Sequence, residues 1–165
     1  MTDMRLIAAV ASFAVAAAAA QAPSFTVRLL TPEAALKAAQ AALAKCRAQG
    51  YQVAVAVVDR GGLTQVLLRD RHAGPHTIEL ATNKAWTAVS FRTHTRDLER
   101  LTRPGETMSG LRNVPRFTAI GGGVMVEAGG SLMGAIGVSG APGGDADHAC
   151  ATAGVEAISE ELELQ

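Results

Sequence analysis

The stretch FTAIGGGVMVEAGGSLMGAIGVSGAPGGDADHAC, residues 117–150, decides the fold of this chain. Two apolar runs, residues 124–127 and 131–139, flank Gly129-Gly130. Short apolar runs joined by Gly-Gly predict a β-hairpin with a primed turn. The second run passes through GAPGG into Asp145, after which apolar residues recur at helical spacing. The predicted unit is therefore a hairpin, a tight loop and a helix.

The junction between this loop and helix has two interpretations. Unpaired N–H groups at a helix start attract anions, so an anion site is one of them. The glycines do not form G-x-G-x-x-G, however, and no Lys-Ser/Thr follows the loop. Because Asp145 and Asp147 stand in the first helical turn, capping by these carboxylates is the favoured interpretation.

The composition predicts one globular domain and excludes a polyanion-binding surface. The chain has 165 residues, is 48% hydrophobic and 18% charged, and has a formal net charge of +0. Neutral charge and an aromatic content of only 4% argue against nucleic acid as a partner.

The first 20 residues read as a secretory signal peptide, with the domain spanning residues 21–165. Arg5 precedes an apolar run, residues 6–20, that is too short to span a bilayer comfortably. The run ends in Ala-Ala-Ala, which fits an A-x-A cleavage site. We therefore expect a periplasmic or secreted protein with no membrane span after the signal is removed.

Export would place Cys46 and Cys150 in an oxidising compartment, where a disulfide persists. Neither cysteine belongs to a C-x-x-C motif or to the paired Cys/His spacing of a zinc site. The sequence leaves two alternatives open, a long-range disulfide and two buried thiols.

The first half of the domain predicts a helix followed by a second hairpin. Thr31-Pro32-Glu33 is a helix start and Gly50 a helix stop, so helix one covers residues 32–49, and its many alanines indicate close packing. Residues 53–58 and 63–69 have strand character, and Asp59 is expected to begin the turn between them.

A histidine-bearing loop precedes the next helix. Gly74 and Pro75 hold His72 and His76 in or beside this loop, and residues 77–91 follow as a helix that carries Lys84 and Trp86. We expect Trp86 in the core, and Lys84 solvated or salt-bridged. Residues 95–101 predict a short helix, and residues 103–115 a long loop that contains Met108.

The chain contains no readable catalytic motif. There is no H-E-x-x-H, no G-x-S-x-G and no carboxylate pair in a glycosidase context. The residues alone indicate an exported α/β domain with a histidine-bearing loop.

Several runs, taken together, resemble the GlcG/HbpS family of small haem-associated proteins. Their order and spacing cover essentially the whole mature chain: LTPEAALKAAQAAL (30–43), VAVVDRGG (55–62), AGPHT (73–77), NKAWTAVSFRTHT (83–95), IGGGV (120–124) and GAIGVSGAPGGDADHAC (134–150). The resemblance implies an α/β (α+β) fold, profilin-like in outline, in which an antiparallel sheet of about five strands is flanked by helices. It also implies homo-oligomers. The chain departs from the commonest family pattern at His148, where an acid is more usual.

The resemblance makes an exported, non-enzymatic haem-binding protein, used in sensing or storage, the leading hypothesis. The alternatives are an enzyme or accessory factor acting on a small organic acid, as in glycolate-type metabolism, and a structural oligomer without a ligand. Absence of C-x-x-C-H indicates that any haem is bound non-covalently.

His76, inside the AGPHT match, is the best candidate for the iron ligand of such a haem. His72, His148 and Met108 are the protein alternatives, and non-protein or hydroxyl ligation stays open. Lys84 and Arg69 are candidates for pairing with the haem propionates.

Overall fold

The computed structural model describes residues 23–164, which form a single α+β domain. The predicted signal peptide, residues 1–20, lies outside the described residues. Within residues 23–164 no helix is both long and apolar enough to cross a membrane. In chain order the elements are α1 Pro32–Ala48, β1 Ala54–Asp59, β2 Thr64–Arg69, α2 His76–Phe91, α3 Thr95–Leu101, the 3-10 turn η1 Ser109–Asn113, β3 Gly123–Ala128, β4 Ser131–Ser139 and α4 Gly144–Glu163.

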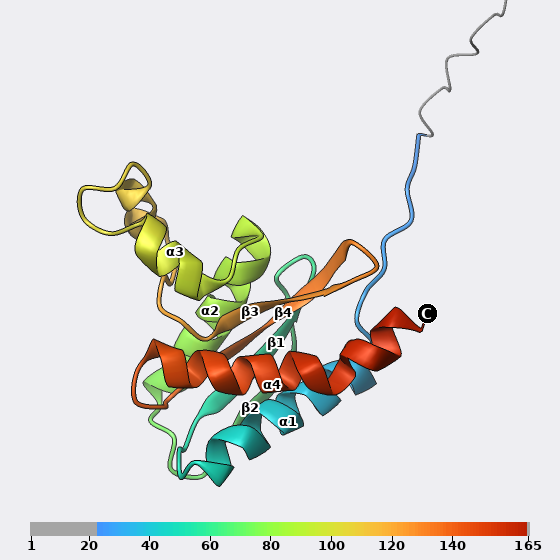
Figure 1. Cartoon of the computed structure of the whole chain (residues 1–165), viewed down its shortest axis with the longest axis horizontal. Helices are drawn as coiled ribbons and strands as arrows, with labels where there is room; N and C mark the ends of the chain where they lie inside the picture. The colour runs from blue at the N-terminus through green and yellow to red at the C-terminus, as the bar shows by residue number, and fades with distance from the viewer. Residues whose placement is uncertain (1–22, 165) are drawn as a thin grey trace, which may run out of the picture.

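The two predicted hairpins, β1–β2 and β3–β4, form one sheet because β1 pairs with β4. The strand order is β2-β1-β4-β3, and every pair is antiparallel. Helices α1 and α4 lie side by side on one face, and α2 packs on the other face against β1, β3 and β4 (Figure 1). The predicted primed turn at Gly129-Gly130 is confirmed, because both glycines have positive φ, 54° and 71°.

Local capping explains the bounds of α1. The Thr31 side chain accepts a hydrogen bond from the Ala34 N–H at 3.2 Å, and Pro32 occupies the first turn. At the other end Gly50 has a φ of 80°, a conformation that favours glycine after a helix. The predicted turn at Asp59 is also confirmed, since its carboxylate accepts from the Leu63 N–H at 3.0 Å.

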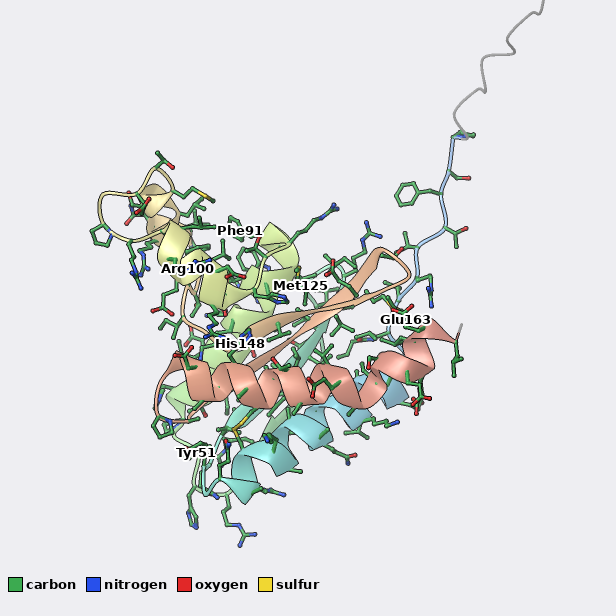
Figure 2. The ribbon with its side chains drawn as sticks, viewed as in Figure 1. Tyr51, Phe91, Arg100, Met125, His148 and Glu163 are labelled. Carbon is green, nitrogen blue, oxygen red and sulfur yellow. A yellow bond between two sulfur atoms is a disulfide. The ribbon has the colours of Figure 1, made fainter. Side chains whose placement is uncertain are left out.

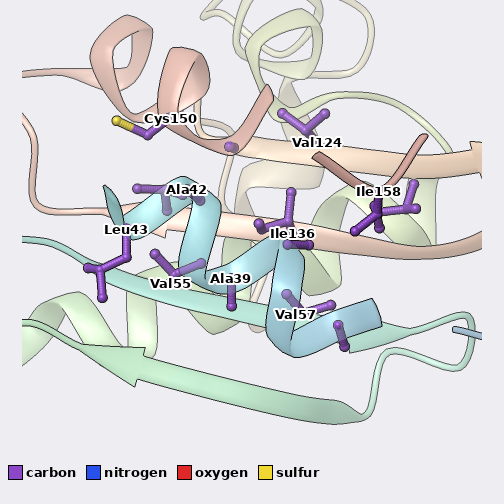
Figure 3. Close-up of a cluster of buried hydrophobic side chains, with 14 of the residues drawn as sticks. Ala39, Ala42, Leu43, Val55, Val57, Val124, Ile136, Cys150 and Ile158 are labelled. Atoms are coloured by element: carbon purple, nitrogen blue, oxygen red, sulfur yellow. The ribbon is translucent and has the colours of Figure 1, made fainter. Parts of the chain in front are cut away.

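Small side chains let α1 approach α4 closely, as the alanines of helix one predicted. Four alanines of α1 are completely buried in the main core, and a side chain at Gly154 of α4 would meet the Ala38 carbonyl oxygen at 2.7 Å. Ile136 and Val55 of the sheet fill the space beneath the two helices, close to Ile158 and Cys150 of α4 (Figure 3). The core therefore consists mainly of small and branched apolar side chains.

Two sequence-based expectations about the fold need correction. The described residues form four strands rather than about five, because the extended segment before α1, residues 25–30, joins no strand ladder. It is held instead by a side-chain bond from Gln65 to the Leu30 carbonyl, at 3.0 Å. Trp86 is half-buried rather than in the core, because its ring lies near the surface with the Arg116 guanidinium 4.8 Å from the ring centroid.

A disulfide joins α1 to α4, which settles the alternatives left open for the two cysteines. Cys46 and Cys150 are bonded, with their Cα atoms 5.5 Å apart, and both are completely buried. The bond closes a loop with a sequence separation of 104 residues, so it restricts the unfolded chain strongly.

We predict that replacing both cysteines by alanine lowers the free energy of unfolding by about 3–5 kcal/mol, because the long loop is no longer closed in the unfolded chain. Denaturant unfolding of the oxidised protein and of the double variant measures the difference. Alkylation of the unfolded, unreduced protein followed by mass spectrometry should find no label on Cys46 or Cys150. Full labelling of both would contradict the bond.

Candidate functional site

The corner between β2 and α2 is built around a buried carboxylate. Asp70 is 1% exposed, and the Arg47 guanidinium donates two hydrogen bonds to it, at 2.7 and 3.0 Å. This guanidinium, and next to it the Arg71 N–H, hold the pKa of Asp70 at about 2. The Ala73 N–H also donates to the Asp70 carbonyl. Asp70 therefore fixes the loop that leads into α2.

This corner brings together two of the residues that the sequence singled out. His76 is the first residue of α2 and is exposed. Arg69, also exposed, ends β2 and donates from Nη1 to the Ala73 carbonyl at 3.0 Å, which ties it to the same loop. His72 is exposed in that loop as well. Imidazole and guanidinium groups are thus available to solvent at one end of the sheet.

The side chains of Leu67 and Arg69 lie on the α2 side of the sheet. Leu67 pairs with Ala56 and Arg69 with Ala54 across the β1–β2 ladder. Ala54 and Ala56 pack against Ala81 of α2. Because partners directly across a ladder share one face of the sheet, Leu67 and Arg69 flank α2.

Exposed apolar side chains extend this surface, which we call the β2–α2 face and define as Leu63, Leu67, Arg69, His76 and Ile78. Leu63 is 71% exposed, Leu67 42% and Ile78 36%. Among residues 23–164, β2 is an edge strand of the sheet, so it has a strand neighbour on one side only. The β2–α2 face combines apolar area, one guanidinium and one imidazole.

Lys84, a further candidate, is instead buried on the inner side of α2. It is 2% exposed, and its ammonium donates to Asp147 Oδ2 at 2.7 Å and to the Val138 carbonyl at 2.9 Å. Asp147 accepts a further bond from the Ala141 N–H at 2.9 Å. Burial lowers the pKa of Lys84 and raises that of Asp147, and the attraction between the two charges opposes both shifts.

Glycines make room for this ion pair. A side chain at Gly122, whose φ is 121°, would meet Asp147 Cβ at 2.8 Å and the Lys84 ammonium at 3.0 Å. At Gly121 it would meet the Gly144 carbonyl oxygen at 2.6 Å. The IGGGV run therefore lets β3 begin directly against the pair.

The expected capping by the two aspartates of α4 is corrected here. The N-cap of α4 is Gly143, and no side chain caps the helix. Asp147 turns back to Lys84, and Asp145 pairs with Arg96 of α3 at 3.1 Å. The burial of Lys84 makes its nearest carboxylate a charge partner rather than a cap.

Met108 lies apart from the β2–α2 face. It is 37% exposed and belongs to the connection between α3 and η1. This connection and the start of α2 are well separated in Figure 1. The structure therefore places His76 and Arg69 at the two ends of one loop, and it places Lys84 and Met108 elsewhere.

A second polar region is a cleft of about 590 Å³ between α3 and the start of α4. Arg100 of α3 and His148 of α4 lie on its two sides (Figure 2). Of the sequence candidates only His148 reaches it. The cleft is lined by His94, Arg96, Asp97, Glu99, Arg100, Arg103, Gly144, Asp145 and His148.

Two histidines meet across this cleft. The rings of His94 and His148 are edge to face, with centroids 5.9 Å apart. His94 Nδ1 accepts from the Met125 N–H at 3.2 Å, so the proton of the neutral ring is on Nε2. His148 Nδ1 is buried without a hydrogen-bond partner in the described structure. Burial, and then the charges of His94 and Arg96, lower the pKa of His148.

Sequence reasoning missed the Lys84–Asp147 pair and the role of α3. Arg96 and Arg100, four residues apart, lie on one face of α3, and Arg103 follows the end of that helix. This spacing is a signal that can be read from the sequence. The distance between Lys84 and Asp147 in the chain left no comparable local signal.

Comparison with known sequences gives one family and several relatives. The sequence model of the family described as "Haem degrading protein HbpS-like" matches residues 30–156. A 15.0 kDa uncharacterized protein from the dhaT-dhaS intergenic region of Citrobacter freundii is 36% identical over 116 residues, which are 69% of this chain and 82% of that protein. The chain also matches 29% of the length of the corrinoid adenosyltransferase PduO of Salmonella typhimurium, at 38% identity over 57% of this chain.

Two solved structures of similar proteins share the fold of this chain. A double mutant of Streptomyces reticuli HbpS has a TM-score of 0.78 and 39% identity, covering 88% of this chain and 99% of its own. The complex of PduOC with haem has a TM-score of 0.74 and 30% identity, covering 79% of this chain and 95% of its own.

We predict that Lys84→Met destabilises the protein by about 3–5 kcal/mol at pH 7, because it leaves a buried carboxylate without its counter-charge. Lys84→Met combined with Asp147→Asn should recover part of this loss, since a neutral amide costs less to bury. Denaturant unfolding of the three proteins provides the test. Equal stability of Lys84→Met and wild type would show that the pair contributes nothing.

A second prediction concerns the stability of the folded protein at acidic pH. The pKa of His148 is lowered from 6.5 in the folded protein, so the unfolded chain binds the proton first as pH falls. His148 therefore makes stability decrease as pH falls below about 6.5. Unfolding of wild type and His148→Gln from pH 8 to pH 5.5 should show a shallower dependence in the variant. A parallel pair of curves would contradict the prediction, and His72→Gln serves as the matched loss of an imidazole.

Proposed function

Because the chain belongs to the HbpS-like family, we propose that it binds haem non-covalently and that His76 on the β2–α2 face is the iron ligand. The observation that carries this proposal is the exposed His76 imidazole at the end of the loop to which Arg69 is tied, together with the exposed apolar side chains of the β2–α2 face. Each part matches one part of haem: imidazole for iron, guanidinium for a propionate, apolar area for the macrocycle.

The apolar part comes from Leu67 and Ile78. A flat macrocycle covering these two side chains would remove apolar surface from water, at roughly 25 cal/mol per Å². Arg69 is already tied to the loop through one nitrogen of its guanidinium. Its remaining donors can pair with a carboxylate without a new restriction of the whole side chain.

Lys84 supports this surface from within rather than pairing with a propionate. Its ammonium already donates to Asp147 and Val138, and breaking that pair would leave a buried carboxylate unpaired. Met108 belongs to the connection between α3 and η1, which lies apart from the start of α2 (Figure 1), so we do not assign it to the same haem as His76 in one protomer. We therefore assign iron ligation to His76, with His72 as the nearest alternative in the same loop.

The same residues indicate how readily the bound haem exchanges and how a second copy of the chain could cover it. A haem held by one side-chain ligand on an open surface is exchangeable, which suits sensing or storage. An open apolar face beside an edge strand also suits a homo-oligomer, in which a second copy covers the bound haem.

The amino-terminal apolar run and the Cys46–Cys150 disulfide support export to the periplasm or beyond the cell.

Haemin titration of the full mature protein tests the proposal. We predict saturation at one haem per protomer with a shifted Soret band. His76→Ala should lose that Soret position and bind at least about tenfold more weakly, and Arg69→Gln a few-fold more weakly, because each removes one charge-assisted or coordinate contact.

The matched controls are His72→Ala, a histidine of the same loop, and His148→Ala, in the separate cleft. Both should bind haemin as wild type does, with circular dichroism confirming the fold. Retention of affinity and Soret spectrum by folded His76→Ala would remove His76 as ligand. No Soret shift with wild-type protein would remove haem binding itself.

A further inference from the structure

We propose that residues 24–27 of one copy of the chain pair, as an added strand, with the open edge of β2 in a second copy. These four residues, Ser-Phe-Thr-Val, are called the N-terminal arm. The pairing rests on the homo-oligomer of the proposed function, for which it names the segment and the edge that join two copies. It does not depend on haem.

The N-terminal arm has the pattern of a strand without a partner. Phenylalanine, threonine and valine favour strands, yet no backbone hydrogen bond within residues 23–164 involves the arm. Phe25 is 83% exposed and Val27 38%. Side chains two residues apart in an extended segment share a face, so these two form one apolar face that its own protomer leaves in water.

The root of the arm is fixed to the domain next to β2. The Leu30 carbonyl accepts from Gln65 Nε2 at 3.0 Å, and Leu30 is 3% exposed. Arg28 Nη2 donates to the Leu162 carbonyl at the end of α4, also at 3.0 Å. Ahead of these contacts the blue segment runs out from the domain (Figure 1). The arm is therefore anchored at its root and directed away from its own sheet.

The edge of β2 offers backbone groups to such a strand. The Asp70 N–H donates to the Val53 carbonyl at 2.9 Å, on the line of the β1–β2 ladder. Residues bonded to a neighbouring strand alternate along an antiparallel ladder, so Leu67 and Arg69 direct their N–H and C=O groups away from β1. Among the described strands none lies beyond β2. Four extended residues also present two residues to one edge, which matches Leu67 and Arg69.

The other edge of the sheet is closed to a further strand. It is formed by β3, whose outward N–H groups at Gly123 and Met125 are both engaged. The first donates to Thr95 Oγ1 at 2.8 Å and the second to His94 Nδ1 at 3.2 Å. Side chains at the start of α3 thus occupy the donors of β3, which leaves β2 as the edge that accepts the arm.

The choice of face follows from what each side of β2 leaves exposed. Leu67 lies on the α2 side and is 42% exposed, whereas Val66 and Leu68, on the other side, pack against the main core. Phe25 and Val27 therefore belong beside Leu67, where pairing removes apolar surface of both copies from water. The second copy then adds apolar side chains to the β2–α2 face.

Sedimentation velocity of the full mature protein without haemin tests the pairing. We predict self-association of wild type and at least tenfold weaker association of Phe25→Ser, because a side chain covered in the assembly is returned to water. Leu101→Ser is the matched control, since it removes a 45% exposed leucine of α3, and it should associate as wild type does.

A monomeric wild type would overturn the pairing, and so would unchanged association of Phe25→Ser, which would assign the contact to another surface such as two β2 strands. Since no haemin is present, either failure leaves haem binding by His76 intact. Conversely, loss of haem binding would not alter these measurements.

Leu67→Pro provides a second variant. Proline is tolerated in an edge strand where the N–H points outward, but it removes the donor that an added strand needs. This variant should keep the circular dichroism of wild type and associate at least tenfold more weakly. Wild-type association in folded Leu67→Pro would contradict the assignment of the β2 edge.

Residue-resolved hydrogen exchange distinguishes a second copy from the chain's own arm folding back. In wild type the N–H groups of Leu67 and Arg69 should exchange more slowly as the protein concentration rises, and this dependence should be lost in Phe25→Ser. Protection that does not change with concentration, or no protection, would refute pairing between copies.

Discussion

The buried ion pair between Lys84 and Asp147 is the constraint on which the rest of the structure depends. It joins α2 to α4 through the sheet, because the Lys84 ammonium also bonds the Val138 carbonyl of β4. Two charges out of water are tolerated only with close geometry and further hydrogen bonds, and the Ala141 N–H supplies one of these to Asp147. The pair thus holds two helices on opposite faces of the sheet in a fixed relation.

Both candidate surfaces follow from this relation. Using Asp147 for Lys84 leaves the start of α4 uncapped, which gives the α3–α4 cleft its amide donors. Fixing the middle of α2 over β1 and β4 leaves the edge strand β2 outside the cover of that helix, so Leu63 and Leu67 remain exposed. The disulfide between Cys46 and Cys150 secures α1 against α4 and adds to the same rigid frame.

Much of the fold was predictable because its signals are local. Thr31, Pro32 and Gly50 mark the ends of α1, and Gly129-Gly130 marks a hairpin turn. Long-range relations were not readable in this way. Nothing near Asp147 in the chain indicates a lysine 63 residues away, so the sequence favours a helix cap for this carboxylate.

The candidate sites show the same contrast between local signals, which the sequence reveals, and long-range contacts, which it does not. His76 and Arg69 are separated by only a short loop, and sequence reasoning placed both at the site without showing that they share one face. His94 and Arg103 come near His148 only because α3 packs beside the start of α4, a relation between segments far apart in the chain. The family resemblance predicted fold and haem, whereas the cleft required the structure.

Hydrogen–deuterium exchange of the full mature protein, with and without haemin, tests the central claim most directly. Haem on the β2–α2 face should slow exchange in peptides covering residues 63–78, and leave those covering residues 94–103 and 144–148 unchanged. Protection confined to the α3–α4 peptides would contradict the assignment of haem to His76 and Arg69.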